Sequence, residues 1–291
     1  MTIKLFHFCG HIISSNESGR FPKSNEENIQ QKIDAYFKEI DVNSCYGSLA
    51  SGADIMLAES LLKKGANIHI VLPFDKDDFL KLSVNPSGSE WKDRFSELIN
   101  QAKSVTQIFY NKPSDNDEVL SFALCTIIAM GLSLIEGMKK KRILKETLKQ
   151  IAIWDSKKTK GYAGTYPDML RWNSIGLDTT CISSKKPIEI RELKIRKKIN
   201  TKTFDIVVYE KTSDSNSYKI DTISELFTNI QSQPFAGNFY IDLDRERYGN
   251  INCNSENISN RALGVIAYEC HLKKETDNLN TLVNKYLKIK T

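Results

Sequence analysis

Short apolar runs alternate with amphipathic stretches through residues 1–182 of this 291-residue chain. Apolar residues spaced three and four apart predict helices at residues 28–40 and 91–102. Short runs rich in apolar and β-branched residues, bounded by glycine, proline or polar residues, predict strands. These runs cover residues 4–8, 68–73, 105–110, 151–155 and 177–182. The alternation of helices and strands predicts the α/β class, with a mostly parallel sheet and helices on both faces.

Residues 43–74 predict a turn of small residues, then a helix that ends at Gly65, then a buried strand. The turn and the start of the helix contain Gly47, Ser48, Ser51, Gly52, Ala53 and Asp54. Small residues let backbone N–H groups approach a ligand, and a helix N-terminus adds a positive dipole. This stretch predicts an anion or phosphate site, although a tight turn packed on the sheet would explain the same residues.

A second glycine loop lies between the predicted strand at residues 151–155 and the next helix. It consists of Gly161, Tyr162, Ala163, Gly164 and Thr165. Gly10 ends the first strand, and in a parallel sheet all three turns share the carboxyl edge, where open α/β sheets bind ligands. We therefore expect a nucleotide or sugar-phosphate site there. The chain has no GxxxxGK[ST] and no complete GxGxxG, so ATP hydrolysis and ordinary NAD binding are not supported.

Several side chains around these turns are candidate contacts, each with a structural alternative. His11 follows the turn at Gly10 and could donate to a phosphate, and Pro73 closes the strand at residues 68–73. The guanidinium of Arg20 could fork onto a phosphate or lie free on the surface. Tyr162 could stack on a base or pack against the protein.

Two acids in the helix after the first glycine turn are further candidates. Asp54 could cap the helix or hold a ribose hydroxyl. Glu59 could act as an acid/base group or bind ribose, or lie on a solvated helix face.

The charge distribution is uneven. The chain carries a net charge of +5, but residues 185–202 hold eight Lys/Arg against two Glu, which leaves the rest of the chain at −1. That segment has no aromatic residue to stack on bases, so nucleic-acid binding is not favoured. The six cysteines form no CxxC pair, so no metal or cofactor is expected and a reducing cytoplasm fits best.

Residues 119–135 carry no charge and invite a comparison with a membrane span. The run is short and includes Ser and Thr, so we expect a buried central helix and no membrane segment. The N-terminus lacks the pattern of a signal peptide. After residue 184 a basic segment is followed by loops rich in Asn and Ser. This change predicts a domain at 1–184, a basic linker or strand at 185–202 and a small α+β module at 203–291. The strand-like runs of that module are residues 204–210 and 238–243, with helices at 223–230 and 279–287.

Four motifs together resemble the SLOG superfamily: FCGH…RFP, GSLASGADIMLAESLLKKGANIHIVLPF…DF…SV, W..RF and IAIWD…GYAGT. Its members are Rossmann-like proteins related to the cytokinin-activating LOG phosphoribohydrolases and the DNA-processing protein DprA. GSLASGAD resembles the DprA glycine loop, and GYAGT stands where LOG proteins have PGGxGT. The similarity covers residues 3–183 and is strongest to the variant found before nucleotide-cyclase or signalling domains.

The resemblance implies a nucleotide-derived small molecule bound over the two glycine loops. Some members sense signalling nucleotides in bacterial antiviral systems, and LOG enzymes cleave the N-glycosidic bond of nucleoside monophosphates. Here PGG is replaced by Gly161-Tyr162-Ala163, and Asp168 is the carboxylate nearest to the LOG acid. We therefore expect a homo-oligomeric sensor or sequestering protein. A hydrolase that uses Glu59 or Asp168 is the alternative, and DprA-like DNA binding is a third.

Overall fold

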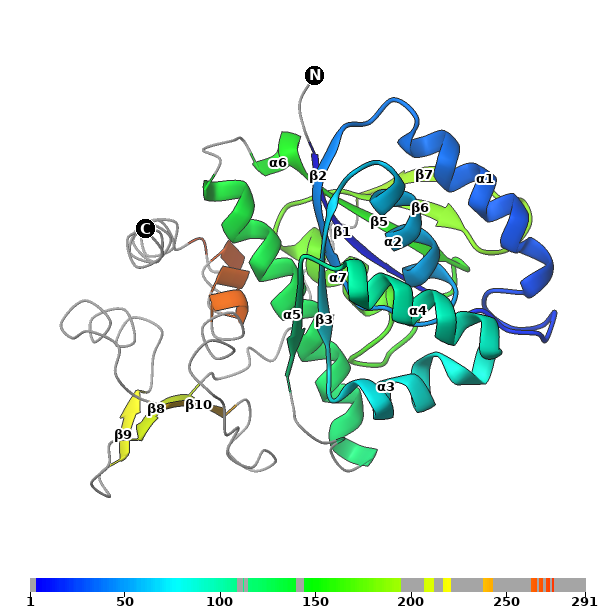
Figure 1. Cartoon of the computed structure of the whole chain (residues 1–291). Coiled ribbons are helices and arrows are strands. Elements are labelled where there is room, and N and C mark those ends of the chain that lie inside the picture. The colour runs from blue at the N-terminus through cyan, green and yellow to red at the C-terminus, as the bar shows by residue number, and fades with distance from the viewer. Residues whose placement is uncertain are drawn as a thin grey trace.

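A computed structural model describes most of the N-terminal two thirds of the chain (Figure 1). The described residues are 4–108, 112, 115–139, 144–194, 263–265, 267–268, 271–272 and 274, with the backbone of three strands between 207 and 242.

A seven-stranded sheet in the order β4-β3-β2-β1-β5-β6-β7 forms the centre. Its strands are β1 (Lys4–Gly10), β2 (Val42–Gly47), β3 (Asn67–Leu72), β4 (Ser104–Gln107), β5 (Leu148–Trp154), β6 (Thr179–Ser183) and β7 (Ile190–Leu193). The first six are parallel, and β7 pairs antiparallel with β6 at one edge. The chain builds outward from β1 in one direction and then resumes at β5 on its other side, so the strand order reverses between β1 and β5.

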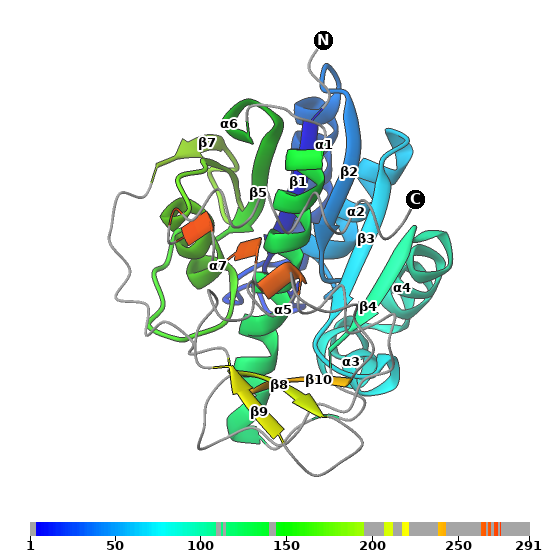
Figure 2. The ribbon, with the colours of Figure 1, turned by 90° about the vertical axis from the view of Figure 1, so that its left-hand side faces the viewer.

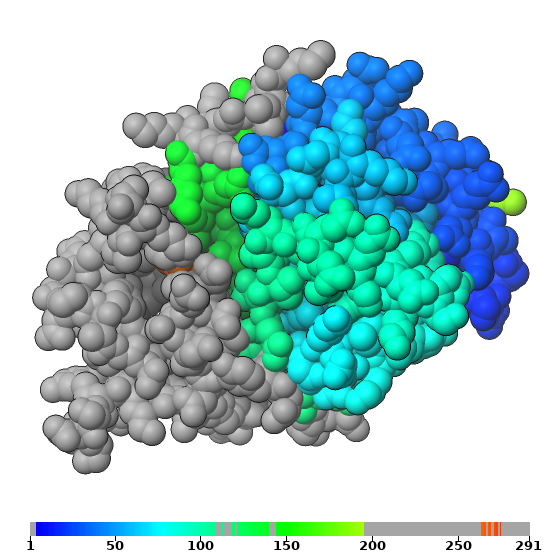
Figure 3. All heavy atoms as spheres, in the orientation of Figure 1, coloured from blue at the N-terminus to red at the C-terminus, as the bar shows by residue number. Residues whose placement is uncertain are grey.

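Helices cover both faces of this sheet. They are α1 (Glu26–Phe37), α2 (Ala53–Lys63), α3 (Lys76–Ser83), α4 (Ser89–Gln101), α5 (Asp115–Lys139), α6 (Leu144–Thr147) and α7 (Thr165–Ser174). Figures 1 and 3 show α1 to α4 together on one side, and Figure 2 shows α5 lying across the other. The predicted α/β class with a mostly parallel, Rossmann-like sheet is confirmed.

The alternation of side chains along β1 explains the two layers. Phe6 and Phe8 pack into the core under α1, α2 and α4, whereas Leu5 packs into the core under α5. Strands buried on both faces are apolar along their whole length, which is why short apolar runs predicted them.

The long helix α5 is apolar enough to cross a membrane by length and composition. However, 72% of its apolar window, with a mean hydropathy of 1.7, is buried inside the protein. The helix packs on β1, β2 and β3. It is therefore a core helix, as the sequence predicted.

The described residues at 263–265, 267 and 268 pack against α5, where Leu263, Val265, Ala267 and Tyr268 are buried. A Cβ on Gly131 would lie 1.7 Å from the carbonyl oxygen of Gly264, so glycine at these positions permits direct backbone contact. The described residues of this segment belong to the same core as α5 and α7.

One local prediction was wrong. Residues 43–47, which we read as a turn, belong to strand β2. The acidic residues after β3 start α3, where the Asp75 carboxylate caps the amides of Asp77 and Asp78, both at 3.0 Å.

In the C-terminal part, β8 (Val207–Lys211), β9 (Ser217–Ile220) and β10 (Asn238–Asp242) form a separate antiparallel sheet in the order β10-β8-β9. Strands β8 and β10 match the predicted runs, and β9 was not predicted. The predicted helices at 223–230 and 279–287 lie outside the described residues, and the domain boundaries stay a prediction. β7 lies inside the basic segment 185–202 and completes the large sheet.

Gly131→Ala should destabilise the protein, because the new Cβ must push residue 264 away from α5. We expect a loss of about 1–3 kcal/mol in the free energy of unfolding, measured by urea denaturation. Gly137→Ala in the same helix is the control, because its Cβ would meet side-chain atoms and no backbone, namely Leu144 at 2.8 Å and Leu148 at 3.1 Å. Alanine favours a helix by roughly 1 kcal/mol over glycine, so the control should be neutral or stabilising. Equal stabilities of the two variants would contradict the backbone contact.

Candidate functional site

The carboxyl ends of β1 and β5 meet at the point where the strand order reverses. Gly10 ends β1, and a Cβ there would lie 2.2 Å from the Cβ of Ala53 at the start of α2. Asp155 directly follows β5, and α7 begins ten residues later at Thr165. Open α/β sheets bind ligands at such a reversal of the strand order.

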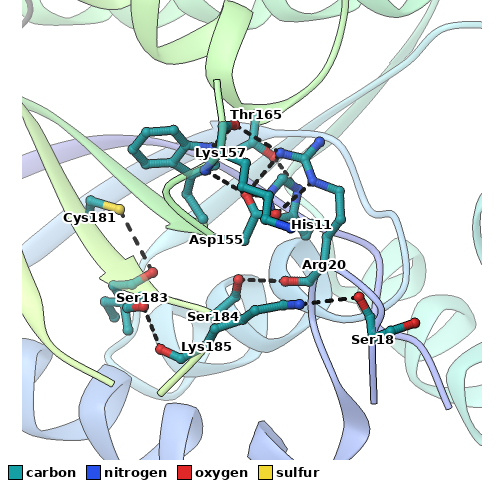
Figure 4. A network of polar contacts seen from close by, with 12 residues as sticks. His11, Ser18, Arg20, Asp155, Lys157, Thr165, Cys181, Ser183, Ser184 and Lys185 are labelled. Carbon is teal, nitrogen blue, oxygen red and sulfur yellow. Dashed lines mark hydrogen bonds and ion pairs between the residues drawn. The ribbon is translucent and has the colours of Figure 1, made fainter. Parts of the chain in front are cut away.

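A network of polar side chains joins these ends (Figure 4). His11 Nε2 lies 3.1 Å from Asp155 Oδ1, and His11 Nδ1 lies 3.0 Å from the hydroxyl of Thr165. Arg20 donates Nε and Nη2 to the two oxygens of Asp155, at 3.0 and 2.9 Å. The amide of Lys157 donates to Asp155 as well, at 3.1 Å. The network thus connects β1, β5, α7 and the loop after β1.

The charges in this network are fixed by their surroundings. Burial alone would raise the pKa of Asp155, but hydrogen bonds from Arg20, the Lys157 amide and His11 hold it below its ordinary value. Burial and the nearby Arg20 lower the pKa of His11 to about 4, although Asp155 works in the opposite direction. Neutral His11 therefore donates Nε2–H to ionised Asp155 and accepts the Thr165 hydroxyl at Nδ1.

Arg20 acts first as a clamp on the protein. Besides Asp155 it donates Nη2 to the carbonyl of Lys157 at 3.2 Å, and its own carbonyl accepts the hydroxyl of Ser184 at 2.7 Å. Its side chain is 41% exposed, and its Nη1 bonds to no other described residue. One edge of the guanidinium remains for a ligand.

The first glycine turn is closed by the protein itself. Its amides at Ala50, Ser51 and Ala53 donate to the Asp54 carboxylate and to the carbonyls of Ser83 and His11, at 2.9–3.2 Å. The hydroxyl of Ser51 contacts Ser87 at 2.6 Å, and Ile12 forms a bridge with Gly52. This part of the structure favours the packed-turn alternative for residues 50–53 over a phosphate cradle.

The glycines of this turn serve close packing. A Cβ on Gly47 would lie 2.6 Å from the ring of Phe8, and Gly52 has a φ of 92°, which L side chains rarely adopt.

The second glycine loop is open. Gly161, Tyr162 and Gly164 are exposed, Ala163 is half-buried, and Tyr162 retains 58% of its accessible surface. Gly164, with a φ of 108°, leads into α7. The amides of residues 161–164 donate to no other described residue, so the N-terminus of α7 offers free donors to an anion.

Two buried acids lie at the N-terminal turns of α2 and α7. Asp54 accepts the Ala50 amide through Oδ2, and its Oδ1 has no hydrogen-bond partner among the described residues. Asp168 accepts from Arg171 Nη1 at 3.2 Å and also from Thr126. Asp54 does not cap α2, in contrast to the capping alternative.

Burial, helped by the nearby Asp168 and opposed by hydrogen bonds from the backbone, raises the pKa of Asp54 to about 7. Burial likewise raises the pKa of Asp168 to about 6, against Arg171. Both acids also act on the buried thiols of Cys9 and Cys125, whose pKa values burial raises well above normal. The thiol of Cys125 donates to the carbonyl of Val71 at 2.9 Å. The cluster can therefore exchange a proton near neutral pH.

Glu59 and Pro73 lie apart from these groups. Arg94 of α4 grips both oxygens of Glu59, at 2.8 and 2.7 Å, and also pairs with Glu26 of α1. Glu59 therefore joins three helices on the outer face, and no contact brings it to His11 or Asp168. Pro73 is buried directly after β3.

Sequence reasoning missed Asp155 and Arg171. The signal for Asp155 was a charged residue at the end of an apolar run, in IAIWD, at the ligand-binding edge of the sheet. Arg171 gave no such signal, because its partners are Asp168 and the carbonyl of Tyr162 in the folded chain.

Comparison with models of known protein families found no match, and comparison with curated proteins found no significant similarity. Among the described residues, no group of three His, Cys, Asp or Glu side chains could hold a metal ion. The chemistry of the site is therefore inferred from its own residues.

Asp54→Asn should change the pH dependence of stability. A carboxyl whose pKa is raised from 3.8 to about 7 binds a proton more tightly in the folded state, so the native protein loses stability as pH rises from about 4 to about 7. Asparagine does not titrate. Relative to the native protein, the free energy of unfolding of the variant should rise by roughly 4 kcal/mol across this window, measured by urea unfolding. Asp93→Asn, at an exposed position in α4, is the control. A constant difference between Asp54→Asn and the native protein from pH 4 to 8 would contradict the buried, protonated acid.

Proposed function

We propose that the protein binds a nucleotide-derived small molecule at the carboxyl edge of the sheet between β1 and β5. The observation that carries the proposal is the open loop 161–164 at the start of α7, beside the network of His11 and Arg20. The anionic part of the ligand would accept from the free amides of this loop. The helix dipole of α7 and the Nη1 edge of Arg20 favour the same charge.

The loop also supplies a surface for a base. Tyr162 is one of the most exposed large side chains in the described part of the chain, at 58%. Its carbonyl accepts from Arg171, which fixes the backbone under the ring. A ring held in this way can stack on a nucleobase, which is typically worth about 1–3 kcal/mol.

The acids behind the loop supply the polar group that a ribose requires. Asp54 has a free buried oxygen, and a carboxyl with a pKa near 7 can either donate to or accept from a hydroxyl. The role as a sensor in bacterial antiviral signalling, the cytoplasmic location and the homo-oligomeric state rest on the SLOG resemblance alone.

Equilibrium filtration against a nucleotide panel, read by mass spectrometry, tests the proposal. The panel would hold nucleoside monophosphates, NAD, ADP-ribose, cyclic ADP-ribose isomers and cyclic oligonucleotides. We expect one compound to be retained intact. Tyr162→Ala should weaken its binding about tenfold or more, whereas Tyr162→Phe keeps the ring and should retain it. Retention of no compound, or equal binding by both variants, would overturn the proposal.

Hydrolysis of a nucleotide N-glycosidic bond is the second candidate, and the raised pKa values of Asp54 and Asp168 favour it. A general acid works best when its pKa lies near the working pH. In this case incubation would release free base from a nucleoside monophosphate. Asp168→Asn should lower the rate by at least about 100-fold, measured by chromatography of the base, while the ligand still binds. If the native protein returns every nucleotide intact, the protein is a binder.

A further inference from the structure

A groove of about 440 Å³ lies over β5, β6 and β7, beside the first turn of α7. It shares no lining residue with the network of His11 and Asp155 or with loop 161–164. The loop after β5 adjoins both places, because Ser156 and Lys158 line the groove and the carbonyl of Lys157 accepts from both Trp154 and Arg20. Pockets that hold small molecules typically measure about 300–1,000 Å³, so the groove is large enough for one.

The edge of the sheet builds this groove. Every second residue around β7, namely 189, 191 and 193, lines the groove, because side chains two apart in a strand lie on the same face. In the pairing of β7 with β6, Arg191 lies opposite Cys181. Tyr166 forms the wall on the side of α7.

The rim of the groove is positively charged. Lys158, Arg191 and Lys194 line it against a single acid, Glu189. Arg191 donates Nε and Nη2 to one oxygen of Glu189. Lys194 lies 3.8 Å from Asp178, which makes a long ion pair on an exposed surface. Exposed pairs of this kind leave most of the positive potential in place.

The floor of the groove is aromatic and rigid. The rings of Trp154 and Tyr166 stack with centroids 5.5 Å apart and planes 13° apart. The indole N–H of Trp154 donates to the carbonyl of Lys157 at 3.1 Å, which fixes the ring. An aromatic floor under a ring of cations suits a flat ring that carries a negative charge.

We propose that this groove is a second ligand site, which binds an anion attached to an aromatic ring, of the nucleoside monophosphate class. The anion pairs with Lys158 and Arg191, and the ring lies against Trp154 and Tyr166. The site stands independently of the proposed function, because a ligand at the start of α7 uses other residues.

The test uses the full chain with the indole N–H groups labelled with ¹⁵N and 5′-AMP as the probe. Trp154 is in the groove, whereas Trp91 and Trp172 are fully buried elsewhere and serve as internal references. Trp154→Phe assigns the signal. We expect AMP to shift the Trp154 resonance alone and saturably. Adenosine and inorganic phosphate, which each lack one half of the probe, should bind at least about tenfold more weakly.

The double variant Lys158→Ala and Arg191→Ala should bind AMP at least about tenfold more weakly. Lys92 is an exposed lysine on the opposite face of the sheet, and Lys92→Ala should leave AMP binding unchanged. Tyr162→Ala should leave the Trp154 shift intact, which separates this site from the one at α7. The proposal is wrong if AMP leaves Trp154 unmoved, if the double variant binds normally, or if the shift disappears with Tyr162→Ala. If an acidic peptide shifts the Trp154 resonance and AMP does not, the proposed ligand class is wrong.

Discussion

The buried carboxylate of Asp155 is the constraint on which the carboxyl edge of the sheet depends. A buried charge is tolerated only when it is paired and hydrogen-bonded, and here Arg20, His11 and a backbone amide supply those bonds. The bonds from His11 and Arg20 to Asp155 hold the loop after β1 beside the end of β5. His11 in turn fixes Thr165 at the start of α7, and the carbonyl of Arg20 accepts from Ser184 beyond β6. One charge thus sets the positions of three strand ends.

The same constraint makes the two glycine loops differ. Once residues 11–13 are held beside β5, their backbone pairs with the first loop. The Ala53 amide donates to the carbonyl of His11, and the Ile13 amide donates to the carbonyl of Ser51, at 3.2 Å each. The amides of the second loop donate to no other described residue. Two similar small-residue sequences therefore have different chemistry, and the difference comes from the partner that each loop meets in space.

The fold class could be predicted from the sequence because strands buried on both faces are apolar in any local window. Strand β2 could not, since Asn43 and Ser44 resemble a loop. Their partner is Glu136 of α5, which accepts from Ser44 at 2.9 Å across 92 positions of sequence. Glu59 shows the same limit, because its pairing with Arg94 depends on the contact of α2 with α4. Local pattern predicts which segments are buried, and only the fold shows which polar groups they satisfy.

The number of hydrogen bonds that each buried carboxyl group accepts separates the acids that stabilise this structure from those available for chemistry. Asp155 receives four hydrogen bonds, and they lower its pKa. Asp54 is equally buried, but one of its oxygens lacks a partner and its pKa rises to about 7. A buried carboxyl left in that state costs stability, although the other oxygen of Asp54 accepts the Ala50 amide. Asp54 and Asp168 both lie in the first turn of the helix that follows a glycine loop. We propose that a ligand hydroxyl is the partner that the described residues do not supply to Asp54.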